Sequence, residues 1–595
     1  MPSKQTRRPS SLQSPYTSFF GTSYAPSPSE RTELEVLISG AQQELVELDS
    51  EMFRIRVRRN RVQNFLDDHR TLLSPVRRLP TETLAEIFTH CLPTQRFPIR
   101  SLKEAPLLLT MVCRKWRKIA MTHPPLWNAL HIHVASEIAS DAHELKLRQQ
   151  GICEWIARSG ALPLSFSLSM DEIANNCLDI FHDYFFQSVM NLSPRLETFH
   201  LEVGDLIYKW LEKLSPRTFP ILKRLSLSLD AYTVDINSKI PFVSRIPGMP
   251  VLASLRINGF YPYQHLESTY ANHRLNLTEL DLGGDLSWSL PLQHILALLR
   301  GNPKLQHCSV HVQADLAAQT YVTVDLHSLR SLSIRFDGDD EEGDSYDLME
   351  KSFRSLNCPA LKALSVISRN HDHTMLPDRF AFTHLLGSLQ HLRLEFTMTD
   401  EDLIRCLALA PNLTVLEIVD CKYAVGDQDS SSGSSSHHYQ VQDTALQRLT
   451  DDPSSPVVVL CPKLETLRLL APLPYELVKK PQPVNISTRA LVEFLESRKG
   501  TGNRTSKLRE CTILMSSKLK TSAAMLKRLT LLMQDGMLLR VGQADRGYSS
   551  YKSEDDPESR AIFHSSNAFI PFDAYVFRDL GYGLGRTTVD NISDS

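Results

Sequence analysis

Paired cysteines and long apolar runs are both missing from this sequence. Its ten cysteines are spread singly without a CxxC pair, which argues against a disulfide framework or a zinc ribbon and predicts ordinary buried thiols. The opening residues MPSKQTRRPSSLQSPY hold no apolar core of the kind that a secretory signal needs. No later run is long and apolar enough to span a bilayer. We therefore expect a cytoplasmic or nuclear protein without a membrane partner.

An excess of charge of one sign is missing as well. The 595 residues include 65 Lys and Arg against 68 Asp and Glu, which leaves a net charge of −3. A charge this small predicts no overall attraction to nucleic acid or anionic lipid, and we expect no nucleic-acid partner. Hydrophobic residues make up 42% and charged residues 22%, which is ordinary for a globular chain with room for several domains or one long repeat array.

Catalytic motifs are the third absence. No GxSxG, HExxH or P-loop motif occurs, and the Gly-rich GYGLGR at 581–586 lacks the flanking strand and helix of a phosphate-binding loop. His131 and His133, like His371 and His373, have no third ligand at a recognisable spacing. We expect no enzyme, no cofactor and no metal. A hydrolase or transferase stays an alternative, because catalytic groups can converge through the fold alone.

A long helix is the first feature that is present. Residues 1–29 are rich in Ser and Pro and predict a disordered tail. Over 30–73, apolar residues recur in alternating steps of four and three, which predicts a coiled-coil-like helix. The stripe consists of Leu34, Ile38, Ala41, Leu45, Leu48, Met52, Ile55, Val62 and Leu66, with Arg59 interrupting it once.

The charges of this helix are segregated, with acidic residues in its first half and a basic run at 54–61 in its second. Such a run is typical of a solvated helix face, of nucleic-acid binding or of nuclear import. A sharper hypothesis is an antiparallel homodimer through 30–72. In that arrangement the acidic half of one copy would face the basic half of the other.

Three short pieces follow within 74–133. Leu79 and Pro80 lead into apolar residues spaced i, i+3, i+4, i+7, which predict a short helix with Pro80 in its first turn. The segment MVCRKWRKIA at 111–120 predicts a second helix with one apolar face. After a His-Pro-Pro break and Leu126-Trp127, ALHIHV from 129 alternates like a strand.

These pieces read L-P-x-E-x-L-x-x-I-F, V-C-R-x-W-R-x-I-A and P-x-L-W in order. Together they resemble an F-box, specifically the F-box-like domains common in mushroom-forming fungi. The linking segment 93–106 is longer than is usual in that family. The resemblance implies docking on a Skp-type adaptor of a cullin ubiquitin ligase. By position, the adaptor-binding residues would be Leu79, Pro80, Leu84, Ile87, Phe88, Val112, Cys113 and Trp116.

Beyond residue 155 the unit L-x-x-L-x-L recurs, often after a proline, as in PILKRLSL at 220–227 and PNLTVLEI at 411–418. Most of the spacings lie between 24 and 32 residues, near the period of leucine-rich repeats. The last two apolar positions of each unit are two residues apart and would point inward from a strand. We expect an irregular solenoid over 134–545 that contains loops 337–347 and 424–442, followed by a loose tail over 546–595.

The predicted fold class is therefore α/β, a leucine-rich-repeat solenoid preceded by a small all-α F-box and an N-terminal coiled-coil-like helix. The predicted function is a substrate-recruiting F-box subunit of a cullin-type ubiquitin ligase, with an unknown target protein bound by the repeats. The alternative is a non-catalytic leucine-rich-repeat scaffold that engages no ligase. The non-leucine strand positions predicted to face outward and bind the target include Glu279, Asp281, Gln390, Arg393, Glu417, Glu465 and Arg468.

Overall fold

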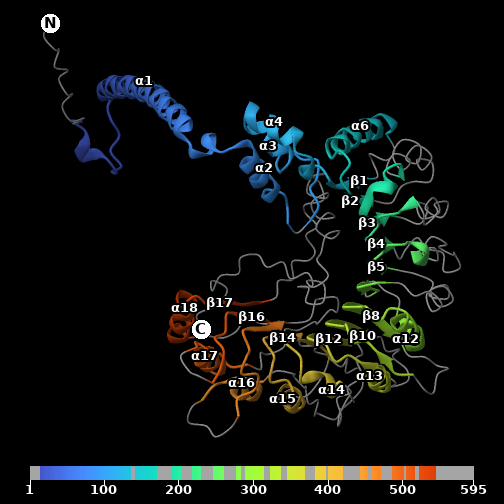
Figure 1. The fold of residues 1–595 in the computed structure, drawn as a ribbon. Coiled ribbons are helices and arrows are strands. Elements are labelled where there is room, and N and C mark those ends of the chain that lie inside the picture. Colours follow the sequence, from blue (N-terminus) through green and yellow to red (C-terminus); the bar gives the residue numbers. More distant parts are fainter. Residues whose placement is uncertain are drawn as a thin grey trace. The chain divides into compact units, whose positions relative to one another are not determined.

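The computed structural model (Figure 1) divides the chain into two compact units, Met1–Leu84 and Ala85–Ser595. The residues that the structure describes are 14–94, 96–135, 141–170, 190–203, 218–229, 246–259, 276–282, 289–313, 322–336, 345–368, 382–396, 400–419, 442–452, 458–470, 486–500, 504–515 and 522–543.

The first unit is dominated by the helix α1, Pro28–Leu73, which is 46 residues long. Its start is well defined, because Pro28 occupies the first helical position and the backbone N–H of Ser27 donates to the Glu30 carboxylate at 2.7 Å. None of its residues is buried. A helix thus occupies the predicted segment 30–73, whereas its pairing as a coiled coil stays a prediction.

The second unit is organised by one parallel sheet of 15 strands. Along the sheet the strands follow in chain order, and β7 pairs with β8 beside that path. Their bounds are β1 Ala129–Val134, β2 Leu164–Met170, β3 Leu196–Val203, β4 Arg224–Leu229, β5 Ser254–Gly259, β6 Glu279–Asp281, β7 Leu290–Pro291, β8 His307–Gln313, β10 Ser331–Phe336, β12 Ala363–Ser368, β13 His391–Glu395, β14 Val415–Val419, β15 Thr466–Leu470, β16 Glu510–Met515 and β17 Leu538–Gln543. A separate two-stranded sheet pairs β9 Val324–Asp325 with β11 Leu356–Asn357.

From β7 onward, most of the described connections between strands contain a helix, and Figure 1 shows these helices beside the strands. Among them α15 contacts α16, α16 contacts α17, and α17 contacts α18. Besides α1, the α-helices among the described residues are α2 Thr81–His90, α3 Leu107–Val112, α4 Arg114–Thr122, α6 Ala142–Arg158, α12 Leu292–Arg300, α13 Ser345–Arg354, α14 Thr383–Leu386, α15 Asp400–Ala408, α16 Asp443–Leu449, α17 Thr488–Ser497 and α18 Ala523–Gln534.

The core lies on the apolar face of this sheet. Strand pairing brings one apolar residue of each strand on the path into a continuous row, and every member is at most 3% exposed. Since neighbouring strands are about 4.8 Å apart, these side chains pack on one another along the sheet. The row runs Leu130, Phe166, Phe199, Leu225, Leu255, Leu280, Cys308, Leu332, Leu364, Leu392, Leu416, Leu467, Cys511 and Leu539.

The prediction of a leucine-rich-repeat solenoid is wrong. The chain forms a mixed α/β fold around one large parallel sheet, with an N-terminal helix, and its layout resembles a solenoid only loosely. The L-x-L parts of the motifs do lie on strands, as in β4 and β14. The helices described in the return segments are not a repeated unit, because their lengths range from four residues in α14 to 17 in α6. A solenoid depends on near-identical stacked units, and strand periodicity alone could not reveal that these returns differ.

The segment predicted to be a small all-α F-box leads directly into the sheet. The boundary between the two units falls inside α2, and β1 at the end of the predicted segment is the first strand of the sheet. Within the second unit, the indole N–H of Trp127 donates to the carbonyl of Ala120 at 2.7 Å. Trp127 also packs edge-on against Trp155 of α6, with ring centroids 4.8 Å apart. These buried contacts join α4 to the helix that follows β1.

Several predicted features lie outside the described residues: the disordered tail up to residue 13, most of the loops 337–347 and 424–442, the tail over 546–595, the pair His371 and His373, and GYGLGR at 581–586. Within the described residues, no helix is long and apolar enough to cross a membrane.

The end of α17 is fixed by the fully buried Arg498. Its guanidinium donates to the carbonyl of Leu449 at 2.6 and 2.9 Å, to that of Leu460 at 2.9 Å and to that of Cys461 at 3.2 Å. Cys461 has a φ of 45°, in the left-handed region that is unfavourable for a residue with a side chain. Arg498 thus supplies donors to carbonyls that no helix or strand satisfies, and it ties α17 to the segment that enters β15.

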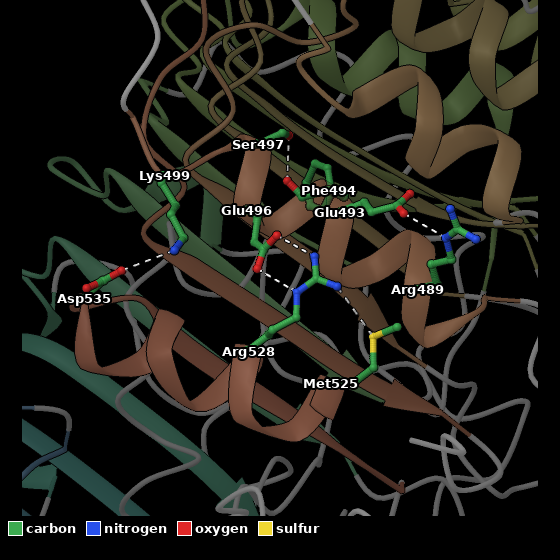
Figure 2. Close-up of polar contacts among 9 residues, drawn as sticks. All are labelled: Arg489, Glu493, Phe494, Glu496, Ser497, Lys499, Met525, Arg528 and Asp535. Carbon is green, nitrogen blue, oxygen red and sulfur yellow. Dashed lines mark hydrogen bonds and ion pairs between the residues drawn. The ribbon is translucent and has the colours of Figure 1, made fainter. Parts of the chain in front are cut away.

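More exposed polar contacts join α17 to α18 (Figure 2). The Glu496 carboxylate accepts from Arg528 Nε at 2.9 Å and from Arg528 Nη2 at 2.6 Å, and these bonds lower the pKa of Glu496. Lys499 Nζ lies 3.4 Å from Asp535 Oδ2. Because such exposed pairs contribute little to stability, the buried Arg498 is the stronger constraint on this end of the sheet.

Replacing Arg498 by methionine should lower the free energy of unfolding of the second unit by about 3 kcal/mol, because the carbonyls of Leu449 and Leu460 lose their side-chain donor. The carbonyl of Cys461 keeps the backbone N–H of Leu464 at 3.1 Å. The matched control is Arg489→Met on α17, whose side chain is 78% exposed and pairs with Glu493 on the same helix; it should cost under about 0.5 kcal/mol. Denaturant unfolding followed by tryptophan fluorescence measures both. Equal losses for the two variants would contradict the assigned role of Arg498.

Candidate protein-docking surfaces

The part of the predicted F-box that lies in the second unit has a small core of its own. Phe88 of α2 is fully buried, and its ring lies 4.7 Å from that of Trp116 in α4. Cys113 separates α3 from α4, and its sulfur accepts from the backbone N–H of Trp116 at 3.5 Å, so it caps the start of α4. Ile119 and Ala120 fill the buried side of that helix.

Large apolar side chains remain exposed on the same short helices. They are between 38% and 57% exposed, which is far from the burial of the sheet core. Exposed apolar side chains gathered on a few adjacent turns are typical of a protein interface. This exposed apolar set consists of Ile87, Leu108, Met111, Val112 and Met121.

Positive charge accompanies these apolar residues. The stretch 107–122 contains Arg114, Lys115, Arg117 and Lys118 and no Asp or Glu, and all four basic residues are exposed. Arg117 Nε donates to the carbonyl of Thr110 at 2.8 Å, which fastens α4 to α3. The surface of α3 and α4 therefore combines apolar contact area with a positive field, which would favour an acidic partner.

The structure separates the predicted adaptor-binding residues by exposure. Leu84 and Phe88 are buried, and Leu79 and Trp116 are half-buried. These four have limited surface to offer a partner. Pro80, Ile87, Val112 and Cys113 are exposed. Sequence reasoning missed Leu108, Met111 and Met121, because a helical apolar position on a short helix does not by itself say whether it faces the core or water.

The second candidate surface is the polar face of the sheet. The residues that follow the buried apolar row by one position are paired in register along the same path, and all are polar. Because alternate residues of a strand point to opposite faces, the row lies on the side away from the apolar core. This polar row runs His131, Ser167, His200, Ser226, Arg256, Asp281, Ser309, Ser333, Ser365, Arg393, Glu417, Arg468, Thr512 and Arg540.

A chain of ion pairs crosses four neighbouring strands on this face. Arg393 Nη1 lies 2.6 Å from Glu417 Oε1, and Arg393 Nη2 lies 3.0 Å from Glu395 Oε2. Arg468 Nη1 lies 3.7 Å from Glu417 Oε2, and Arg468 Nε lies 3.2 Å from Glu510 Oε1. Acidic and basic groups alternate, so each buried charge faces an opposite one. A similar pair joins Arg256 Nε to Asp281 Oδ2 at 2.9 Å.

The predicted outward exposure of the target-binding residues is wrong for three of them. Asp281, Arg393 and Glu417 are buried and engaged in ion pairs. Glu279, Glu465 and Arg468 are half-buried, and Gln390 is exposed. Strand alternation correctly separates these residues from the apolar row but cannot tell a solvated face from one whose side chains cover each other. Their role in target binding stays a prediction.

The two strand histidines have partners on the neighbouring strand. His131 Nδ1 shares a hydrogen bond with Ser167 Oγ at 3.0 Å, and His133 Nδ1 shares one with Ser169 Oγ at 3.0 Å. Among the described residues, no group of three or more His, Cys, Asp or Glu side chains is arranged to hold a metal ion. These histidines take part in the hydrogen bonding of the polar face.

Comparison with known proteins adds no family. No family model matches the chain, and no curated protein matches it either. Among solved structures, a crystal structure of a Bacteroides fragilis protein matches at 12% sequence identity and a TM-score of 0.25, over 56% of this chain and 68% of that chain. At that TM-score the likeness carries no argument. The resemblance to an F-box therefore stays a prediction from the sequence.

Replacing Glu417 by glutamine should lower the free energy of unfolding by about 3 kcal/mol, because Arg393 and Arg468 would then face each other without the acid between them. The matched control is Glu197→Gln, which removes a more exposed pair with Lys223 at 2.6 Å and should cost under about 0.5 kcal/mol. Denaturant unfolding measures both variants. A Glu417→Gln protein as stable as the control variant would show that the chain of ion pairs does not hold the strands together.

Proposed function

We propose that this protein is a substrate-recruiting F-box subunit of a cullin-type ubiquitin ligase. The observation that carries the proposal is the exposed apolar set on α2, α3 and α4, which accompanies the F-box-like motifs of the sequence. Docking would remove the apolar surface of Met111 and Val112 from water. This burial contributes a favourable free energy of about 25 cal/mol for each Å² of apolar surface covered. A Skp-type adaptor is the partner that this combination of motif and surface supports.

In this proposal the sheet carries the target. Its half-buried polar positions, such as Glu279, Arg468 and Glu510, retain surface for contact with a second protein, while the buried ion pairs beside them hold the contact groups in place. The protein would perform no chemistry itself. It would raise the local concentration of target lysines near a charged ubiquitin carrier, an effect that can exceed the separate affinities by orders of magnitude.

The test is co-purification of the full chain with a Skp-type adaptor. The double variant Met111→Asp/Val112→Asp should weaken binding at least about 100-fold, because charges would be buried at the centre of the contact. Leu147→Asp, at an α6 position that is 49% exposed, is the matched control and should bind like the wild type. If the folded wild type does not bind, the alternative of an interaction scaffold outside the ubiquitin ligase replaces this proposal.

Cys113 offers a second test. The exposed thiols of Cys91, Cys113 and Cys153 should react with a bulky maleimide, whereas burial raises the pKa of Cys511 to about 12 and keeps that thiol protonated. Labelled wild type should lose adaptor binding. Labelled Cys113→Ser should keep it, because serine also caps a helix and carries no label. Equal loss in both proteins would place the contact away from Cys113.

A further inference from the structure

The helix α1 presents large apolar side chains that are exposed, and none of its residues is buried. At 1.5 Å per residue, its 46 residues extend about 70 Å. The large apolar residues of its heptad stripe from Ile38 to Leu66, and Leu73 one heptad further on, are between 43% and 71% exposed. A lone helix does not keep such a stripe in water when a partner helix can cover it. The question is which partner fits.

The heptad positions identify the residues beside the stripe. With Ile38, Leu45 and Met52 at position a, and Leu34, Leu48 and Ile55 at position d, the flanking positions e and g follow directly. Position e holds Glu35, Gln42, Asp49, Arg56, Gln63 and Arg70, and position g holds Leu37, Glu44, Glu51, Arg58, Phe65 and Leu72. All charges on these positions are acidic up to residue 51 and basic from residue 56.

This pattern disfavours two copies of α1 side by side in the same direction. In a parallel pair, position g faces position e five residues further along the other helix. Glu44 would then face the partner subunit's Asp49, and Glu30 would face the partner subunit's Glu35. Only the pair between Glu51 and the partner subunit's Arg56 would be favourable.

We propose that α1 pairs with α1 of a second copy in antiparallel orientation, centred between Phe53 and Arg54. The stripe then interlocks along its whole length, for example Met52 with the partner subunit's Ile55 and Leu45 with the partner subunit's Val62. Because the two copies are related by two-fold symmetry, the acidic half of each helix lies along the basic half of the other. The interaction does not depend on the proposed ligase function.

The flanking positions agree with this register. Glu35 meets the partner subunit's Arg70, Asp49 meets the partner subunit's Arg56, and Glu51 meets the partner subunit's Arg58. Each pair occurs twice in the dimer. Within its own helix Arg70 lies 3.6 Å from Asp67, but both side chains are well exposed, so that contact competes weakly.

Two residues on the stripe are polar and help to select the register. Arg59 and His69 occupy positions a and d, where polar side chains lower stability but favour one alignment. In the proposed register Arg59 lies across from the partner subunit's Leu48, with its guanidinium able to reach water at the edge of the interface.

Sedimentation equilibrium of the full chain tests the association. We expect a dimer for the wild type and a monomer for Leu45→Asp, which places a charge on the stripe. The matched control is Val46→Asp. Val46 is adjacent and 67% exposed, against 60% for Leu45, but it lies off the stripe. A wild type that is monomeric would overturn the proposal, whether or not nucleic acid binds the basic half of α1. The proposal would also fail if Leu45→Asp and Val46→Asp weakened the dimer equally.

Mixing two charge-reversal variants tests the orientation. Glu35→Arg and Arg70→Glu should each weaken self-association about tenfold, because each turns both copies of one ion pair into a repulsion. An equimolar mixture should form a heterodimer near wild-type affinity. In a parallel dimer, residues 35 and 70 lie about 50 Å apart along the helix, so mixing would not restore affinity. A mixture as weak as the separate variants overturns the antiparallel arrangement.

Discussion

In-register pairing of parallel strands is the constraint on which the rest of the structure depends. Because each strand aligns with the next, equal positions of successive strands form rows across the sheet. The apolar row from Leu130 to Leu539 is the buried core, and the polar row from His131 to Arg540 follows it by one residue. A slip of one residue in a single strand would exchange the two sets of side chains. The burial of each strand therefore fixes the alignment of its neighbours.

The polar face shows how charge is accommodated beside such a core. Arg393, Glu417 and Arg468 lie on consecutive strands, and their opposite charges alternate. An isolated buried charge is costly, but alternation across neighbouring strands gives every charge an opposite neighbour. The consequence for recognition is that the most buried of these groups act by holding the face together. In the proposed function, a target protein would contact the positions that retain exposed surface.

The exposed apolar surfaces of this protein described above lie on helices and not on the sheet. Met111 and Val112 stay exposed on α3, while Phe88 of α2 and Trp116 of α4 pack on each other. On α1 none of the stripe is buried, and its large apolar residues from Ile38 onward are exposed. The charge beside each surface differs: it is positive throughout on α4, and acidic then basic along α1. An acidic partner suits the first, and a second copy in reverse orientation suits the other.

By itself, the amino-acid sequence determined the long helix over 30–73, because its apolar residues keep heptad spacing without a breaker. It also determined which face of each strand is apolar, because L-x-L alternation allows only one such face. The tertiary structure alone decided that the strands join one sheet within a mixed α/β fold, since return segments such as α6 and α14 differ in length. It also decided that Asp281, Arg393 and Glu417 are buried, because burial depends on neighbouring strands that are distant in sequence. The sequence also could not show that Leu108 and Met111 are exposed. A local pattern identifies an apolar helix face but does not show whether another segment covers it.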